Sequence, residues 1–195
     1  MEIYTRQQDI SMNTKIKVCV VGLGGVGYWV AKFLAMSGVE DFYLFDHDVL
    51  EIHNLNRLDL PLAALDKNKA DIAKLVIKQL RPDVNVVSLP FKFKGEFLRE
   101  EVDIIVDCTD NIDSQKKIYE HAKGKNIKYM KVGYNGTHIT VANKVATWGD
   151  ETEGGYTITP SWVVPAVWVA SMAVGAILKY HLSEVSQDIC NLYGI

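Results

Sequence analysis

Cysteine is scarce in this sequence of 195 residues. The three cysteines, Cys19, Cys108 and Cys190, lie far apart and form no C-x-x-C pair. An odd number of isolated cysteines argues against a disulfide framework and against a structural zinc site, so no zinc is expected. A reducing compartment, the cytoplasm, suits such a chain.

The sequence also lacks a surplus of charge of either sign. Its 21 Lys and Arg residues stand against 24 Asp and Glu residues, for a net charge of -3, and no block of like charges occurs. Such a chain offers no broad positive surface, so neither nucleic acid nor anionic lipid is expected as a partner. Any phosphate must be bound locally, by a few well-placed donors.

Long apolar runs are missing too. One uncharged, mostly apolar stretch runs from Trp162 to Leu178, with Pro165 near its start. As a helix it would be only about 25 Å long, which is short for a membrane span. Residues 1–15 lack the apolar centre of a secretory signal. We expect no membrane span and no export, and a late apolar helix buried in a core or a subunit interface.

What the sequence does have is a regular alternation of β-branched runs and helical periods. This pattern predicts an α/β fold with a doubly wound, Rossmann-like, mostly parallel sheet, in a single domain over residues 1–195. The expected strands are 17–21, 42–45, 84–88, 103–107 and 128–132, with an added antiparallel strand within 136–148. The expected helices are 25–35, a segment containing 72–80, 111–122 and 165–181. Gly38 and Gly124 are expected to end the first and third helices.

A glycine-rich turn follows the first strand directly. It reads Gly22-Leu-Gly24-Gly25-Val-Gly27 and opens the first helix. Glycine lets the backbone turn tightly and approach a phosphate, while the helix N-terminus supplies N–H donors and partial positive charge. A nucleotide site is the functional interpretation, and a tight structural turn is the alternative.

The second strand ends in an acidic sequence, Asp46-His47-Asp48. An acidic side chain at this strand end can accept hydrogen bonds from ribose hydroxyls. A ribose carboxylate indicates a nucleoside, but it does not distinguish NAD from ATP.

The next segment favours a triphosphate. Asn54-Leu-Asn-Arg57 is followed by Lys69 at the start of a helix. Together they offer the amide, guanidinium and ammonium donors that a triphosphate needs beyond a glycine turn. The alternative is a solvated loop with a surface lysine.

The fourth strand ends in Asp107-Cys108-Thr109-Asp110-Asn111. In a doubly wound sheet this strand end faces the same crevice as the glycine turn. Asp110 could therefore hold a hydrated Mg²⁺ ion between phosphate oxygens. Capping of the following helix by Asp or Asn is the alternative, and both roles are compatible.

In combination, these motifs resemble the ThiF/MoeB/HesA family, the bacterial relatives of ubiquitin-activating enzymes. The family pattern runs from an Arg-Gln near the N-terminus through GxGGxG, DxD, NLxR, a Lys and a DCxDN element, and the match runs in order from Tyr4 to Asn111. In that family the C-terminal glycine carboxylate of a ubiquitin-like protein attacks the α-phosphate of ATP, which gives an acyl-adenylate and pyrophosphate. The resemblance implies an ATP-dependent, Mg²⁺-dependent adenylyltransferase that forms a homodimer. Its substrate would be a ubiquitin-like protein, a sulfur-carrier protein or a peptide.

The resemblance also assigns roles to individual positions. Asp46 would bind ribose, Asp110 would bind Mg²⁺, and Arg6 would reach into the partner subunit's site. The implied catalytic residues are Arg6, Arg57, Lys69 and Asp110. The implied nucleotide-binding residues are Gly22, Gly24, Gly25, Gly27, Asp46, Asp48, Asn54, Arg57, Lys69, Asp110 and Asn111.

Two family features have no counterpart here. Both zinc-binding C-x-x-C pairs are missing, and the polar segment 149–160, where the family's acceptor cysteine normally lies, contains no cysteine. Cys190 is then the candidate acceptor thiol. A non-catalytic ThiF-like scaffold partner and an NAD(P)-binding oxidoreductase are the alternative functions.

Overall fold

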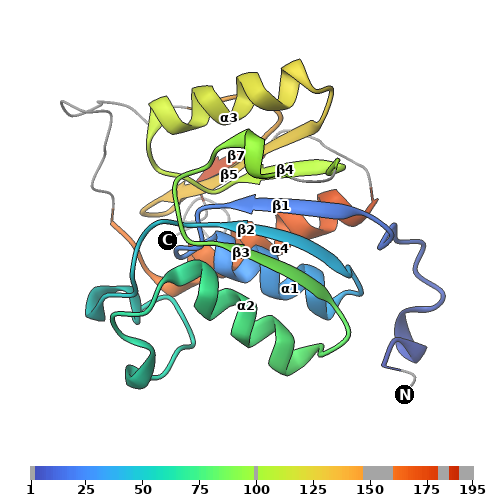
Figure 1. The fold of residues 1–195 in the computed structure, drawn as a ribbon, viewed down its shortest axis with the longest axis horizontal. Coiled ribbons are helices and arrows are strands. Elements are labelled where there is room, and N and C mark those ends of the chain that lie inside the picture. Colours follow the sequence, from blue (N-terminus) through green and yellow to red (C-terminus); the bar gives the residue numbers. More distant parts are fainter. Residues whose placement is uncertain (1–2, 99–100, 147–159, 180–184, 189–195) are drawn as a thin grey trace.

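The computed structural model describes residues 3–98, 101–146 and 160–179, and the strand 185–188. Within these residues one sheet has the strand order β3-β2-β1-β4-β5-β6-β7 (Figure 1). The first five strands along the chain pair in parallel, and β6 and β7 are added antiparallel. The strands are β1 (Lys17–Val21), β2 (Asp41–Phe45), β3 (Asn85–Leu89), β4 (Ile104–Asp107), β5 (Lys128–Asn135), β6 (His138–Ala142) and β7 (Val185–Asp188).

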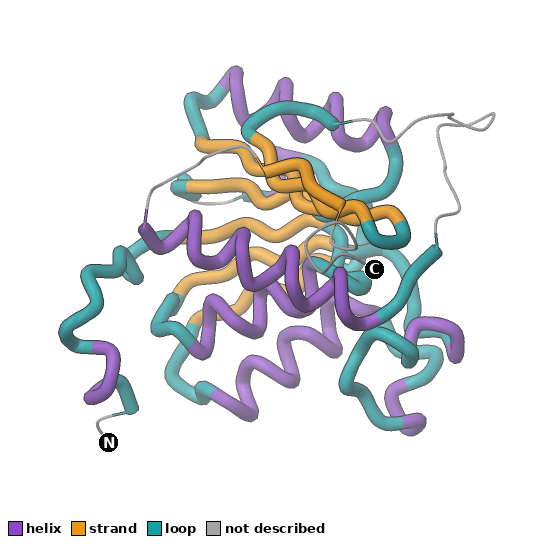
Figure 2. Tube along the Cα trace, turned by 180° about the vertical axis from the view of Figure 1, so that it is seen from behind, coloured by secondary structure: helices purple, strands orange, loops and turns teal. Residues whose placement is uncertain are grey.

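Helices cover both faces of the sheet. Helices α1, α2 and α4 lie on one face and α3 lies on the other (Figures 1 and 2). The central strands are therefore apolar on both sides, and four of the five residues of β1 are buried. The helices are α1 (Gly27–Met36), α2 (Lys69–Leu80), α3 (Ile112–Gly124) and α4 (Val163–Lys179). The short 3-10 turns are η1 (Thr5–Gln7), η2 (Ile52–Asn54), η3 (Leu62–Ala64) and η4 (Gly95–Phe97).

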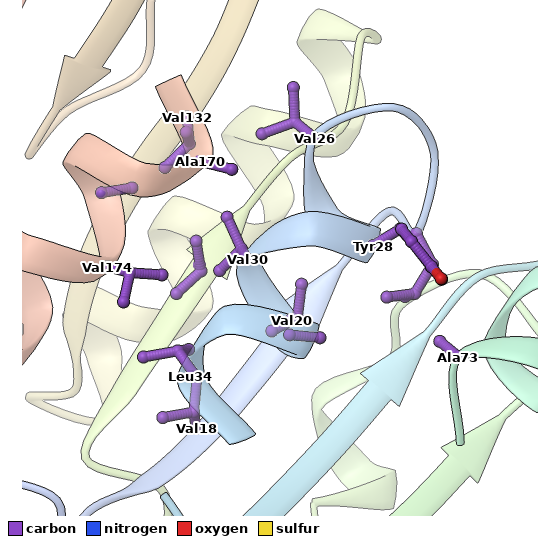
Figure 3. Packing of buried hydrophobic residues seen from close by; sticks show 14 of the residues in the cluster. Val18, Val20, Val26, Tyr28, Val30, Leu34, Ala73, Val132, Ala170 and Val174 are labelled. Carbon is purple, nitrogen blue, oxygen red and sulfur yellow. The ribbon is translucent and has the colours of Figure 1, made fainter. Parts of the chain in front are cut away.

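The main core lies between the sheet and the helix pair α1 and α4. Val30 and Leu34 of α1 face Val20 of β1, with Ala170 and Val174 of α4 beside them (Figure 3). All five side chains are less than a tenth exposed. This packing fixes the N-terminus of α1 at the carboxyl end of β1, next to β4, where the strand order reverses. A crevice at such a reversal is the usual ligand site of doubly wound sheets.

The predicted fold class is confirmed, and most elements lie within a few residues of their expected bounds. Pro165 falls in the first turn of α4, and Gly38 adopts the expected left-handed conformation with φ +108°. Helix α3 ends at Gly124, as expected. Asn126, two residues further on, takes the left-handed conformation, with φ +55°. Asparagine tolerates this region because its short polar side chain can hydrogen-bond locally.

In the described part of the chain, none of the helices combines the length and apolarity that crossing a bilayer requires. Helix α4, the apolar candidate, buries one side against the core: Ala166, Val169, Ala173 and Ile177 are buried. The interpretation of this stretch as a buried helix is confirmed for that side.

Candidate nucleotide-binding site

The turn between β1 and α1 has room only for glycine at two positions. Gly22 has φ +87°, and a Cβ there would lie 3.0 Å from the carbonyl oxygen of Cys108. A Cβ on Gly27 would overlap the carbonyl oxygen of Gly22. The backbone N–H groups of Gly22 and Cys108 also donate to the ends of β2 and β1, each at 2.8 Å. The glycine turn is thus packed tightly against the end of β4, and its role in phosphate binding stays a prediction.

Helix α1 begins without a capping side chain. Asn68 and Asn111 accept hydrogen bonds from first-turn N–H groups of α2 and α3, whereas Val26, at the same position of α1, provides none. Within the described residues, no carbonyl or side chain accepts from the N–H groups of Gly24, Gly25 or Val26. These open donors, at the positive end of the helix dipole, form an arrangement that binds anions.

The side chain of Arg57 lies against this turn. A Cβ on Gly25 would come within 2.8 Å of its Cδ and 3.0 Å of its Nε, so the third glycine leaves room for the arginine. Nη1 donates to the carbonyl oxygen of His53 and to Oδ1 of Asn56, both at 2.9 Å. Among the described residues, Nε and Nη2 have no hydrogen-bond acceptor, which leaves these donors for an anion at the glycine turn.

Asp46 joins the end of β2 to the glycine turn. Its Oδ2 accepts from the backbone N–H of Leu23 at 2.6 Å, and its Oδ1 accepts from that of Asp48 at 2.8 Å. The side chain is only 7% exposed. Burial raises the pKa of Asp46, against the opposing effect of the two N–H donors and of the Lys69 charge. Each carboxylate oxygen can accept a further hydrogen bond, as a ribose hydroxyl requires.

Lys69 lies close to the end of β2 because Asn68, the residue that caps its helix, is bonded to the segment after that strand. It is the first residue of α2, and its Nζ lies 3.2 Å from Oδ2 of Asp48. Asn68 ties the two segments together, because its Nδ2 donates to the carbonyl oxygens of Asp46 and Asp48 at 3.0 and 3.1 Å. Asp46, His47 and Asp48 could also share a cation, but Asp48 already has Lys69 as a counter-ion.

Asp110 lies beyond β4 in an exposed turn. Within the described chain it has no ion pair, so its carboxylate is available to a ligand. Asn111 caps α3, since its Oδ1 accepts from the N–H of Ser114 at 2.9 Å. The capping alternative is thus confirmed for Asn111, and a role in nucleotide binding stays a prediction.

Two predicted site residues have other surroundings. Asn54 is 4% exposed, and its Oδ1 accepts from the backbone N–H of Glu51 at 3.0 Å, so it shapes the loop before Arg57. Arg6 lies in η1, which packs on the far end of α1 through Tyr4 and Gln7. The 10 residues of α1 separate this end from the glycine turn, a distance of about 15 Å. The structure therefore does not bring Arg6 to the glycine turn of its own chain.

Sequence patterns gave no role to Lys131, which supports the turn that carries Asp110. Lys131, in β5, and Asp107 are both fully buried. The Nζ of Lys131 donates to the carbonyl oxygens of Thr109 and Asp107, and it lies 3.7 Å from Oδ1 of Asp107. The Tyr129 hydroxyl donates to the other carboxylate oxygen at 2.7 Å. The sequence signal that could have revealed this role is a lysine between Met130 and Val132, inside a strand predicted to be buried.

This geometry is that of a Rossmann-like fold, with a glycine turn at the reversal of strand order, where doubly wound sheets usually hold a ligand. The family model named ThiF family matches residues 4–153. The chain belongs to the ThiF family, which confirms the resemblance.

Two curated relatives are adenylyltransferases. The chain is 35% identical over 138 residues to the molybdopterin-synthase adenylyltransferase of Haemophilus influenzae, and 32% identical over 148 residues to the sulfur carrier protein ThiS adenylyltransferase of Escherichia coli. These matches cover 67% and 68% of this chain, and 55% and 59% of the relatives. The chain therefore spans somewhat more than half the length of these relatives.

Solved structures show the same fold. The E. coli MccB structure with ATP superposes with a TM-score of 0.72 at 18% identity, over 90% of this chain and 64% of that one. The E. coli tRNA N6-threonylcarbamoyladenosine dehydratase, TcdA, gives 0.71 at 17% identity, over 86% of each chain.

Proposed function

We propose that this protein is an ATP-dependent adenylyltransferase that activates a carboxylate. The substrate we infer is the C-terminal glycine of a ubiquitin-like or sulfur-carrier protein, or the C-terminus of a peptide. One observation carries the proposal: Gly25, whose N–H has no acceptor among the described residues, lies against the Nε of Arg57, which has none there either. A dinucleotide enzyme needs only the glycine turn, whereas a triphosphate also needs such a cation.

The reaction needs no side chain as nucleophile. A carboxylate oxygen of the substrate attacks the α-phosphorus of ATP, the bond from that phosphorus to the α,β-bridging oxygen breaks, and pyrophosphate leaves with the electron pair. The glycine-turn N–H groups, Arg57 and Lys69 would align the phosphates and stabilise the charge that develops on the leaving group. Asp46 would hold the ribose.

The donor set fits Mg²⁺ as well. Mg²⁺ prefers oxygen ligands, keeps several waters, and usually takes one or two carboxylates beside substrate phosphates. Asp110 supplies an exposed carboxylate after the end of β4, with no ion pair among the described residues, while Asp48 is engaged by Lys69. When bound, the ion would neutralise phosphate charge. Asp110 is the residue we assign to it.

Arg6 is assigned to the active site of a second copy. The position of η1 at the far end of α1 favours action across a homodimer over action within one chain. The homodimer itself is expected from the resemblance, and Arg6 would then add a cation to the partner's phosphate site.

The test is ATP–pyrophosphate exchange with a panel of small carrier proteins and peptides that end in glycine. At least one of them should elicit exchange, and Asp110→Ala should weaken Mg·ATP binding. If no carrier elicits exchange and Asp110→Ala binds Mg·ATP like the wild type, the proposal is wrong. Thermal stabilisation by Mg·ATP without any exchange would favour the scaffold alternative, and preferential NADH binding would favour the oxidoreductase.

A further inference from the structure

The first turns of α1 hold the loop that carries Arg57. The indole Nε1 of Trp29 donates to the carbonyl oxygen of Arg57 at 2.9 Å. Two residues further along the loop, Asp59 accepts from the hydroxyl of Tyr28 at 2.6 Å and pairs with Lys32 through its other oxygen. Both sides of this loop segment are therefore fixed to the helix that begins at the glycine turn.

The indole of Trp29 is itself held in place. The Nζ of Lys32 lies 5.0 Å from the centre of the Trp29 ring, in cation–π geometry. The rings of Tyr28 and Phe33 pack against it with centroid distances of 5.3 and 5.5 Å. Because a cation and two rings fix the indole plane, its N–H is aimed at one carbonyl oxygen.

Asn56 holds the side chain of the same arginine. Its Oδ1 accepts from Nη1 of Arg57 at 2.9 Å, and its Nδ2 donates to the carbonyl oxygen of Ser161 at 2.8 Å. Ser161 lies two residues before the first residue of α4, so Asn56 connects the arginine to the segment that leads into that helix. In the NLxR pattern Asn56 occupies the variable position, to which the pattern gives no role.

We propose that Trp29 and Asn56 are positioning residues that hold Arg57 at the glycine turn, Trp29 through the main chain and Asn56 through the guanidinium. This inference rests on the proposed function, in which Arg57 binds the phosphates of ATP. Neither residue needs to touch the nucleotide. Without them, the long side chain of Arg57 would populate more rotamers, and ordering it around a phosphate would cost affinity. Their effect on ATP binding should therefore require Arg57.

The experiment measures the Kd of Mg·ATP for the full chain by calorimetry. Trp29→Phe removes the indole N–H and keeps a ring, and Asn56→Ala removes both contacts of Asn56. Each should weaken binding about five- to tenfold. The matched control is Trp162→Phe, which removes an indole N–H that donates to the carbonyl oxygen of Gly136 at 3.1 Å and should leave the Kd unchanged.

A double-mutant cycle separates positioning from a general structural effect. In an Arg57→Ala background, Trp29→Phe and Asn56→Ala should cause no further loss of affinity. Wild-type affinity in both single variants, or fully additive losses in the double variants, would overturn the inference. If Arg57→Ala itself binds Mg·ATP like the wild type, the phosphate role of Arg57 in the proposed function fails instead. Should Trp29→Phe melt early, the exposed Asn56 carries the test.

Discussion

The chemistry of single side chains in the site depends on their burial. The thiol of Cys108 lies beside the glycine turn, and burial raises its pKa to about 12 against the opposing charge of Lys131. Cys19 is fully buried, and burial raises the pKa of its thiol as well. Because the thiolate is the reactive form, neither residue suits an acceptor role. Cys190 lies outside the described residues, and its role as acceptor stays a prediction.

Alkylation of Cys108 should accordingly be slow at neutral pH. At pH 7.5 the rate with iodoacetamide should be roughly a hundredfold or more below that of a cysteine with an ordinary pKa, because so little thiolate is present. The rate should rise about tenfold for each pH unit from 8 to 10, since the thiolate fraction grows tenfold per unit below the pKa. Peptide mass spectrometry measures it, with Cys108→Ser to assign the peptide. Alkylation at the rate of a free cysteine would contradict the raised pKa.

On the scale of elements, a buried ion pair between Asp107 of β4 and Lys131 of β5 joins the two strands. Lys131→Met would leave the carboxylate of Asp107 fully buried without its cation, and this should lower the free energy of unfolding by about 3 kcal/mol. Lys128→Met, on the exposed end of the same strand, should change it little. Urea unfolding followed by circular dichroism compares the two variants. Equal midpoints for Lys131→Met and Lys128→Met would rule out this structural role.

Strong local signals made most elements predictable. Strand β1 is almost wholly buried because helices cover both faces of the sheet. Its continuous apolar sequence is typical of such a strand, so the sequence predicts it. Strand β7, Val-Ser-Gln-Asp, carries no such run, and it exists through pairing with β6. The loop around η2 and η3 was not predicted either. It depends on distant contacts, such as that between Asn56 and Ser161, which are 105 residues apart.

At the scale of the whole molecule, Arg6 lies far from the glycine turn of its own chain. If Arg6 serves a partner subunit, an inactive Arg6→Ala chain and an inactive Arg57→Ala chain should complement each other. Mixing equal amounts and allowing subunits to exchange should restore about a quarter of the wild-type pyrophosphate exchange, because half of the dimers are mixed and each has one complete site.

Each variant alone is the control for this mixing experiment, and sedimentation velocity checks that both are dimeric. A mixture as inactive as its parts, in material shown to exchange subunits, would contradict action in trans.

The sequence by itself determined the fold class, the glycine turn and the order of the polar motifs. These are local features, set by strand and helix periodicity and by the backbone demands of a turn. Only the tertiary structure decided which of the polar residues meet. It brought Arg57 onto Gly25, buried Asn54 in a loop, placed Lys131 beneath the Asp110 turn and kept Arg6 at the far end of α1. Such contacts join segments far apart in the chain, and they follow from how helices pack on the sheet.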